Sequence, residues 1–199
     1  MSAIDPKVIP QEVIEVLTTL QDAGHEAFLV GGCTRDLLIG LIPKDWDITT
    51  NAHPEQIEEL FEETYYNNPF GTVGVVSPET PDPRVKVIEV TPYRTEHGYT
   101  DNRRPDKVEF SENLEDDLSR RDFTVNALAY DVLKDKIVDL YNGQSDIAAK
   151  RLVAVGDPDT RFQEDALRML RGIRLAAELE FTISHETYAS IARNVDLLI

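Results

Sequence analysis

The segment VGGCTRDLLIGLIPKDWDITT, residues 30–50, sets the architecture expected for this chain. It opens with the glycine pair Gly31 and Gly32, directly after the apolar run AFLV, and it closes with Asp45 and Asp47 in the run DWDIT. Both runs have the β-branched and aromatic content that is typical of short strands. A helix that starts soon after the glycines fits between them, so the segment predicts strand, turn, helix and strand.

The rest of the chain continues as short apolar runs separated by turn residues. Strands are expected at 27–30, 45–49, 72–77, 85–91, 137–143 (with a turn) and 152–156. Helices are expected at 10–24, 54–61, 114–130 and 144–150, and from residue 160 onward. Residues 93–107 contain almost no apolar side chains and are predicted to form a mobile loop. The change from mixed elements to helices near residue 143 predicts two parts, 1–143 and 144–199.

The composition bounds the class of protein. A net charge of −17 at pH 7 and a pI near 4.5 argue against a nucleic-acid binder that works by general electrostatic attraction, because such binding relies on clustered Lys and Arg. The single cysteine, Cys33, excludes an intramolecular disulfide and indicates a reducing compartment. The sequence has no signal-peptide pattern and no apolar run of about 18 residues, so we expect a cytoplasmic protein with no membrane partner.

The paired carboxylates of the run DWDIT predict a metal site. Side chains alternate along a strand, so Asp45 and Asp47 share one face and Trp46 lies on the other. Like charges this close raise each other's pKa unless a cation compensates, and hard divalent ions such as Mg²⁺ prefer oxygen ligands. The alternative, frequent for so short a pattern, is a strand that presents its carboxylates to water.

Glu89 interrupts the run VKVIEVT, residues 85–91, which otherwise has the content of a strand buried on both faces. If that strand lies beside the aspartate strand, Glu89 completes a cluster of three carboxylates able to hold two metal ions. The alternative is a solvent-facing glutamate on an edge strand.

The glycine pair predicts an anion site near these carboxylates. A glycine turn followed by a helix presents backbone N–H groups to an anion, although two glycines by themselves indicate only a turn. With Arg35 and Lys44 nearby and the aspartates following, the pattern favours a triphosphate site.

Four ordered segments carry a family resemblance: GGCTRDLLIG, KDWDITT, RRDFTVNALAYD and EDALRMLRGIR. They resemble motifs of the class II CCA-adding tRNA nucleotidyltransferases and the related bacterial poly(A) polymerases, over nearly the whole chain. The resemblance implies an α+β fold, with a polymerase β-like nucleotidyltransferase head (1–143) of mixed or antiparallel sheet and helices, then a helical neck (144–199). The implied activity is Mg²⁺-dependent, two-metal addition of C and A from CTP and ATP to tRNA 3′ ends, with release of pyrophosphate.

Position by position, the resemblance also implies roles for single residues. The metal-binding pair is matched by Asp45 and Asp47, with Glu89 as the third acidic residue. The triphosphate-side motif is matched by Gly31, Gly32 and Arg35. The motif that contacts the sugar and senses the ribose 2′-OH is matched by Arg121, Asp122 and Asn126. The base-selecting motif is matched by Asp165 and Arg168. The flexible loop that helps the switch from C to A addition contributes Arg94, Arg103 and Arg104, unless it is only a solvated hinge.

The base-selecting pair also has a physical basis. Three residues apart on a helix, Asp165 and Arg168 share a face and offer an acceptor beside donors. This pair fits the Watson–Crick edges of cytosine and adenine, whereas guanine and uracil would leave buried groups unpaired at about 1–3 kcal/mol for each bad contact. The alternative is an ordinary intrahelical ion pair, worth about 0.2–0.5 kcal/mol. Arg168, Arg171 and Arg174 recur at every third position, which predicts a positive stripe for phosphate or RNA.

Several alternatives stay open at this point. Members of the family usually continue into helical body and tail domains that hold tRNA, so we expect an excised fragment or a short relative with weak tRNA affinity. Poly(A) addition, or addition of only CC or only A, would use the same motifs. An inactive nucleotide-binding module is a further alternative. Glu180 stands where a glycine is often found in the family.

Overall fold

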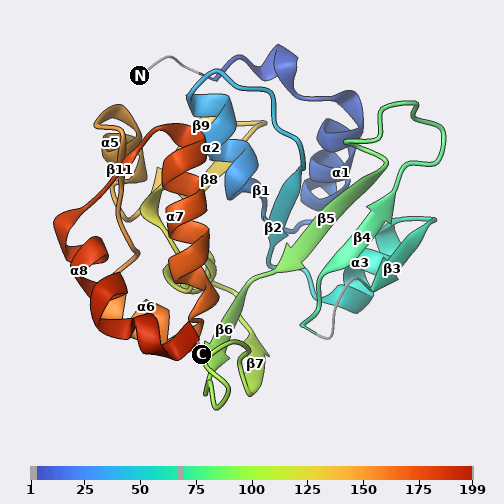
Figure 1. Cartoon of the computed structure of the whole chain (residues 1–199). Helices are drawn as coiled ribbons and strands as arrows, with labels where there is room; N and C mark the ends of the chain where they lie inside the picture. The colour runs from blue at the N-terminus through green and yellow to red at the C-terminus, as the bar shows by residue number, and fades with distance from the viewer. Residues whose placement is uncertain (1–3, 67–69, 199) are drawn as a thin grey trace.

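A computed structural model of the chain describes residues 4–66 and 70–198 (Figure 1). The central mixed sheet has the spatial order β3 (Thr64–Tyr66), β4 (Val73–Val76), β5 (Val87–Pro92), β2 (Asp47–Thr50), β1 (Ala27–Val30), β8 (Leu128–Asp131) and β9 (Lys136–Asp139). Its neighbouring strands are antiparallel except β2 and β5, which run parallel. The mixed sheet flanked by helices confirms the expected α+β fold class.

Helices and two small sheets surround the central sheet. The helices are α1 (Gln11–Asp22), α2 (Gly32–Leu38), α3 (Pro54–Leu60), α4 (Leu114–Ser119), α5 (Gly143–Ala148), α6 (Pro158–Glu164), α7 (Leu167–Leu179) and α8 (His185–Asn194). Single 3-10 turns are η1 (Pro6–Val8), η2 (Thr124–Asn126) and η3 (Val195–Leu198). The small sheets are the hairpin of β6 (Arg94–His97) with β7 (Lys107–Phe110), and β10 (Arg151–Leu152) with β11 (Thr182–Ile183). In Figure 1, α6, α7 and α8 gather on one side of the sheet and the β6–β7 hairpin projects beneath it.

The two faces of the central sheet differ in what covers them. One face carries Leu29, Ile48 and Val90 at consecutive register positions, in one hydrophobic cluster with the buried residues of α1 and α3. The opposite face carries a smaller apolar cluster around Leu118 of α4. Asp47 lies on that second face, since neighbouring positions of a strand alternate. The second face is therefore where polar chemistry can reach the sheet.

Most expected elements lie within a few residues of their predicted places. These are α1, α3 and α5 with β1, β2, β4, β5, β9 and β10. The helix expected at 114–130 is wrong beyond Ser119, because residues 128–131 form β8, which is buried and pairs with β1. A short apolar run such as ALAY fits a buried strand as well as a helix, and only the neighbouring strand decides between them.

The segment 93–107 is also more regular than the predicted loop. Residues 94–97 pair antiparallel with 107–110, from Arg94 opposite Phe110 to His97 opposite Lys107. The expectation of a loop is therefore wrong for the first part of the segment. Because both strands are polar and partly exposed, they lack the apolar alternation by which a strand is recognised.

The C-terminal part is helical as expected, with two interruptions. Asp165 has extended backbone between α6 and α7, and β11 pairs in parallel with β10. Glu180 ends α7 in the left-handed conformation, with φ of 54°, a position that favours glycine. Phe123, Ile147 and Met169 belong to one hydrophobic cluster, so residues on both sides of position 143 share a core. Within the described ranges, no helix has the length and apolar content needed to cross a membrane.

Candidate active site

The aspartate pair lies at the start of β2. Asp47 is the first residue of the strand, whereas Asp45 is exposed in the segment before it, and Trp46 between them is buried. Burial is the largest cause that raises the pKa of Asp47 to about 6, and the charge of Arg121 opposes this shift. The negative charges of Glu89 and Asp45 add to it. The site therefore concentrates negative charge that a cation would stabilise.

Glu89 lies beside Asp47 on the same face of the sheet. The two residues are register partners, because β5 pairs in parallel with β2. β5 is a central strand that buries Ile88 and Val90 on one face and exposes Glu89 on the other. Both the burial on two faces and the edge position considered from the sequence are therefore wrong. In the described part of the chain, no three His, Cys, Asp or Glu side chains form a ready metal site, so a ligand role for Glu89 stays a prediction.

Gly31 allows the turn between β1 and α2 to come close to the carboxylates. Its φ of 78° and ψ of −136° form a conformation that residues with a side chain rarely adopt. A Cβ at Gly31 would lie 3.3 Å from Nη1 of Arg121 and 3.7 Å from Oδ2 of Asp47. Gly31 thus leaves room for a guanidinium group next to the aspartate, and Gly32 starts α2 immediately behind it.

Arg35 is held by protein groups. Its side chain is nearly buried, Nε and Nη2 donate to Oδ1 of Asp36 at 2.9 and 2.7 Å, and Nη1 donates to Oδ1 of Asn126 at 2.5 Å. Lys44 is exposed and lines a cavity of about 500 Å³ that also reaches Arg35 and Asp45. The residues predicted to bind the triphosphate therefore lie around the same carboxylates, with Arg35 fixed and Lys44 accessible.

A second cavity, of about 250 Å³, contains most of the predicted nucleotide-binding residues. It is lined by Gly31, Gly32, Asp47, Arg120, Arg121, Asp122, Asn126, Arg168 and Arg171. Nδ2 of Asn126 donates to Oδ1 of Asp122 at 3.2 Å, and Nε of Arg171 donates to Oδ2 of Asp122 at 3.2 Å. Asp122 therefore connects the predicted sugar motif to helix α7. We call this space the nucleotide cavity.

The predicted base-selecting pair has a different arrangement from the one expected. Asp165 lies in the break between α6 and α7, so Asp165 and Arg168 do not share the face of one helix, and that expectation is wrong. Arg168 is buried and donates to Oε2 of Glu164 at 2.8 Å and to the carbonyl oxygen of Arg120 at 2.9 Å. Asp165 lies 3.4 Å from Nη1 of Arg171 instead. Contact of Asp165 and Arg168 with a base stays a prediction.

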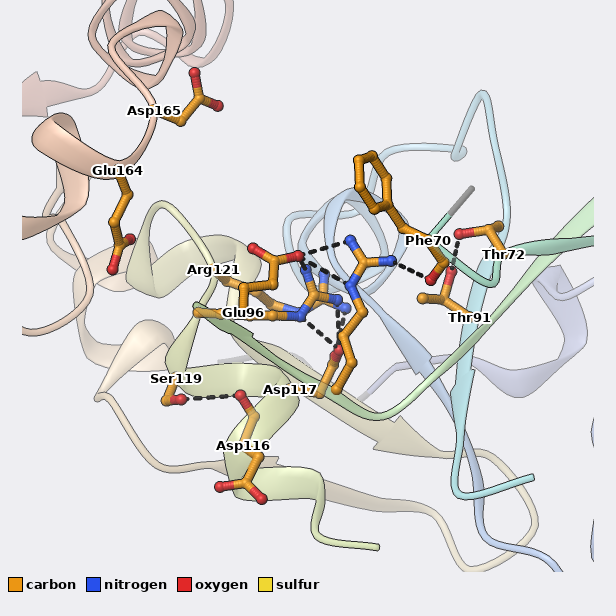
Figure 2. A network of polar contacts seen from close by, with 12 residues as sticks. Phe70, Thr72, Thr91, Glu96, Asp116, Asp117, Ser119, Arg121, Glu164 and Asp165 are labelled. Atoms are coloured by element: carbon orange, nitrogen blue, oxygen red, sulfur yellow. Dashed lines mark hydrogen bonds and ion pairs between the residues drawn. The ribbon is translucent and has the colours of Figure 1, made fainter. Parts of the chain in front are cut away.

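The β6–β7 hairpin is tied to this region through Arg94. Nε of Arg94 donates to Oε1 of Glu96 at 2.9 Å, and Nη1 donates to the carbonyl oxygen of Phe70 at 3.0 Å. Figure 2 shows these two partners, Glu96 and Phe70, in one polar network. Glu96 also accepts from Nη1 of Arg120 at 3.1 Å. Arg94 is therefore part of a polar network at the base of the hairpin.

The tip of the hairpin contacts the break between α6 and α7. The N–H of Ala166 donates to the carbonyl oxygen of Asn102 at 2.8 Å. Arg103 and Arg104 are exposed at this tip, and their backbone N–H groups donate to Oδ1 of Asp101 at 3.0 and 2.8 Å. Their side chains are therefore placed at the surface next to the predicted base-selecting segment.

Asp117 was not predicted, yet it is the buried centre of the network in Figure 2. Its fully buried carboxylate accepts from Nε of Arg120 at 3.0 Å, from Nη2 of Arg121 at 2.8 Å and from Oγ1 of Thr49 at 3.3 Å. Burial would raise the pKa of Asp117, but the charges of Arg120 and Arg121 outweigh it and hold the pKa at about 2. In LEDDLSRR, Asp117 is followed by Arg120 and Arg121 at positions i+3 and i+4, and this helical spacing is the pattern from which the cluster could have been predicted.

Comparison with known proteins identifies the family. Residues 27–153 match the family described as the poly A polymerase head domain. This chain belongs to that family. The CCA-adding enzyme of Lactobacillus helveticus is 47% identical over 188 residues, which is 94% of this chain and 45% of the relative. That of Ligilactobacillus salivarius is 44% identical over 194 residues, 96% of this chain and 46% of the relative.

A solved structure agrees with these relatives. The crystal structure of the Bacillus stearothermophilus CCA-adding enzyme in complex with CTP is similar, with a TM-score of 0.83 and 38% identity. The similarity covers 94% of this chain and 44% of that one, so the chain spans less than half the length of these relatives. The family resemblance inferred from the four motifs is confirmed.

Nucleotidyltransferases of this family generally use divalent metal ions. The ligands available here fit such an ion, because Asp45 and Asp47 supply hard oxygen donors. Asp45 and Asp47 also line the same cavity of about 500 Å³, together with Arg35 and Lys44.

Proposed function

We propose that this chain is the catalytic part of a CCA-adding tRNA nucleotidyltransferase, with head 1–143 and neck 144–199. It would transfer C and A from CTP and ATP to the 3′ end of tRNA and release pyrophosphate. The observation that carries the proposal is the position of Asp47. This residue is the register partner of Glu89 across β2 and β5, and it also lines the nucleotide cavity. The activity named for relatives at 47% and 44% identity supports the same reaction.

The nucleotide cavity offers groups for the sugar and the phosphates. The carboxylate of Asp122 can accept a hydrogen bond from a ribose 2′-OH, and the amide of Asn126 can donate one to the same hydroxyl. Arg121 lies against Gly31 and Asp47, where its guanidinium can bind a phosphate and stabilise the charge that develops during transfer. The buried Nε of Arg121 has no hydrogen-bond partner among the described residues, which leaves it able to serve a ligand.

In the reaction, the 3′ oxygen of the RNA forms a bond to the α-phosphorus of the nucleotide, and the bond to pyrophosphate breaks. Asp45 and Asp47 would hold Mg²⁺, with Glu89 beside them in a two-ion arrangement, to neutralise phosphate charge and favour ionisation of the 3′-OH. Arg121 is held next to Asp47 by Asp117, so its charge is already oriented before the substrates bind.

Selection of C and A would come from Asp165 and Arg168. Arg168 lines the nucleotide cavity, and Asp165 lies 3.4 Å from Arg171, which also lines it. Arg168 keeps a buried Nε without a hydrogen-bond partner in the described residues. A base that satisfies this donor, with Asp165 accepting from the exocyclic amino group, would be cytosine or adenine. We expect weak affinity for the tRNA body, because the chain carries a net charge of −17.

The test is incubation of tRNA that ends at the discriminator base with Mg²⁺ and each labelled nucleotide, read at single-nucleotide resolution. Addition of C, C and A supports the proposal, and Asp47→Asn should abolish it. Glu55→Gln, at an exposed position in α3, is the control that should keep wild-type rates. A long A tract would instead indicate a poly(A) polymerase, and only C or only A a partial enzyme. Selective binding of CTP and ATP without incorporation would indicate a nucleotide-binding module.

A further inference from the structure

Asp47 borders three cavities. One is the cavity of about 500 Å³ that reaches Arg35 and Lys44, and the other two lie on opposite sides of β2. The nucleotide cavity uses β2, β1 and β8, because Gly31 follows β1 and Asn126 precedes β8. A further cavity, of about 380 Å³, uses β2, β5 and β3 and contains Asp45, Asp47, Glu89, Tyr65 and Arg84. Nucleotidyl transfer brings two substrates to one set of carboxylates. With the nucleotide in the nucleotide cavity and its triphosphate toward Arg35 and Lys44, the cavity that contains Tyr65, here called the tyrosine cavity, is left for the other substrate.

Three residues that line the tyrosine cavity, Asp47, Glu89 and Tyr65, belong to a row that crosses four strands. Asp47, Glu89, Gly74 and Tyr65 are successive register partners on β2, β5, β4 and β3, so they share one face. A Cβ at Gly74 would lie 2.7 Å from Cζ of Tyr65, so the tyrosine ring lies over the glycine. The missing side chain of Gly74 thus lets the ring extend from β3 toward the carboxylates. The ring stays accessible, since Tyr65 is 44% exposed.

An accessible aromatic ring beside a reaction site suits the base of a nucleotide. Stacking on an aromatic ring tolerates every base, because each has a π face. In the proposed function the acceptor ends in the discriminator base before the first addition and in cytosine before the next two, so recognition by hydrogen bonds to one base edge would not serve all three additions. We propose that the 3′-terminal nucleotide of the acceptor RNA stacks its base on Tyr65, with its 3′ oxygen near Asp47 and Glu89. This inference rests on the proposed function and assigns the site of its second substrate.

Arg84 adds a positive charge to the same cavity. Its side chain is 44% exposed, and its guanidinium pairs with Asp82, with 2.6 Å between Nη2 and Oδ2. The ion pair fixes the orientation of the guanidinium, and the exposed part suits a phosphate of the RNA backbone. The cavity therefore has a partner for each group at the end of an RNA chain. Tyr65 suits the base, Arg84 suits a phosphate, and the carboxylates lie where the 3′ hydroxyl must react.

The kinetic test uses Tyr65→Ala, with Tyr65→Phe to keep the ring and Gly74→Val to displace it. Tyr65→Ala should raise the KM for the tRNA acceptor about 5- to 150-fold, the range expected for loss of one base stack, with the KM for CTP changed less than about twofold. Tyr65→Phe should resemble wild type, and Gly74→Val should resemble Tyr65→Ala. Tyr188→Ala, at an exposed tyrosine of α8, is the matched control. An unchanged acceptor KM in Tyr65→Ala, or an equal rise for CTP, would overturn the inference.

A binding test that needs no turnover separates this inference from the proposed function. An RNA with 2-aminopurine at its 3′ end should lose fluorescence on binding wild type and Tyr65→Phe, because the base stacks, and should keep it with Tyr65→Ala. If wild type adds no nucleotide to any RNA but shows this Tyr65-dependent quenching, the proposed function fails and the acceptor site stands. Quenching that is the same in wild type and Tyr65→Ala refutes the site, whatever the activity.

Discussion

Replacement of Asp117 by Asn should destabilise the protein in a way that depends on pH. Asp117 is fully buried and holds Arg120 and Arg121 through charged hydrogen bonds. Its pKa is lowered from 3.8 to about 2, which corresponds to about 2 kcal/mol of stabilisation at pH 7. Breaking a buried ion pair on one side costs about 3–5 kcal/mol, and Asn keeps one acceptor oxygen. We therefore expect a loss of about 2–4 kcal/mol in the free energy of unfolding at pH 7.

The sign of the pH effect follows from the lowered pKa. The stabilisation by Asp117 is present above about pH 4 and is lost as the pH falls through about 2, where the carboxyl group becomes protonated in the folded state. The difference in stability between wild type and Asp117→Asn should therefore shrink as the pH is lowered from 7 to 3 and below.

Urea unfolding followed by circular dichroism at pH 7, 5 and 3 measures this difference. Glu115→Gln is the control, since Glu115 lies in the first turn of the same helix but is exposed. A loss below about 1 kcal/mol at pH 7, or the same loss at pH 7 and pH 3, would show that Asp117 does not hold the two arginines by its charge.

Three further outcomes are expected. Gly31→Ala should destabilise the fold by about 1–3 kcal/mol through its left-handed backbone and weaken CTP binding through contact with Arg121, measured by thermal unfolding and calorimetry. Glu180→Gly should stabilise by about 0.5–1 kcal/mol, since it removes the side-chain penalty at φ of 54°; an unchanged or lower melting temperature would contradict this. In metal-free buffer, Asp47→Asn should raise the melting temperature at pH 7.5 and lose any stabilisation by Mg²⁺. The pKa of Asp47 is raised to about 6, so the stability that its protonated form gives the fold is lost as the pH rises through 6. A melting temperature of Asp47→Asn below that of wild type would refute this reasoning.

The sequence predicted those parts of the site that depend on neighbouring residues. The burial of Trp46 between two more accessible aspartates follows from alternation along an extended segment. The glycine turn after β1 was also predicted, because only a residue without a side chain adopts the backbone of Gly31 easily. The prediction of a positive stripe formed by Arg168, Arg171 and Arg174 is wrong for Arg168, because this residue is buried and donates to Glu164. Helix spacing alone does not say which face of a helix becomes buried.

The errors in the fold have a common physical origin. The run ALAY is compatible with helix or strand, and its pairing with β1, about a hundred residues earlier in the sequence, makes it a strand. The polar strands β6 and β7 have no apolar alternation, so their hairpin was expected as a loop. At the break, Asp165 contacts Arg171 of the next helix and Ala166 contacts Asn102 at the hairpin tip, and the local sequence predicts neither contact.

By itself, the amino-acid sequence determined most local elements, the carboxylate pair and the motifs of the family, because each of these depends on residues a few positions apart. Only the tertiary structure decided which distant residues become neighbours. Glu89 lies beside Asp47 because β5 pairs with β2, and Tyr65 reaches toward them because Gly74 of β4 leaves space beneath its ring. Strand order and register are set by packing of the whole sheet, and residues far apart in sequence carry no local signal of it.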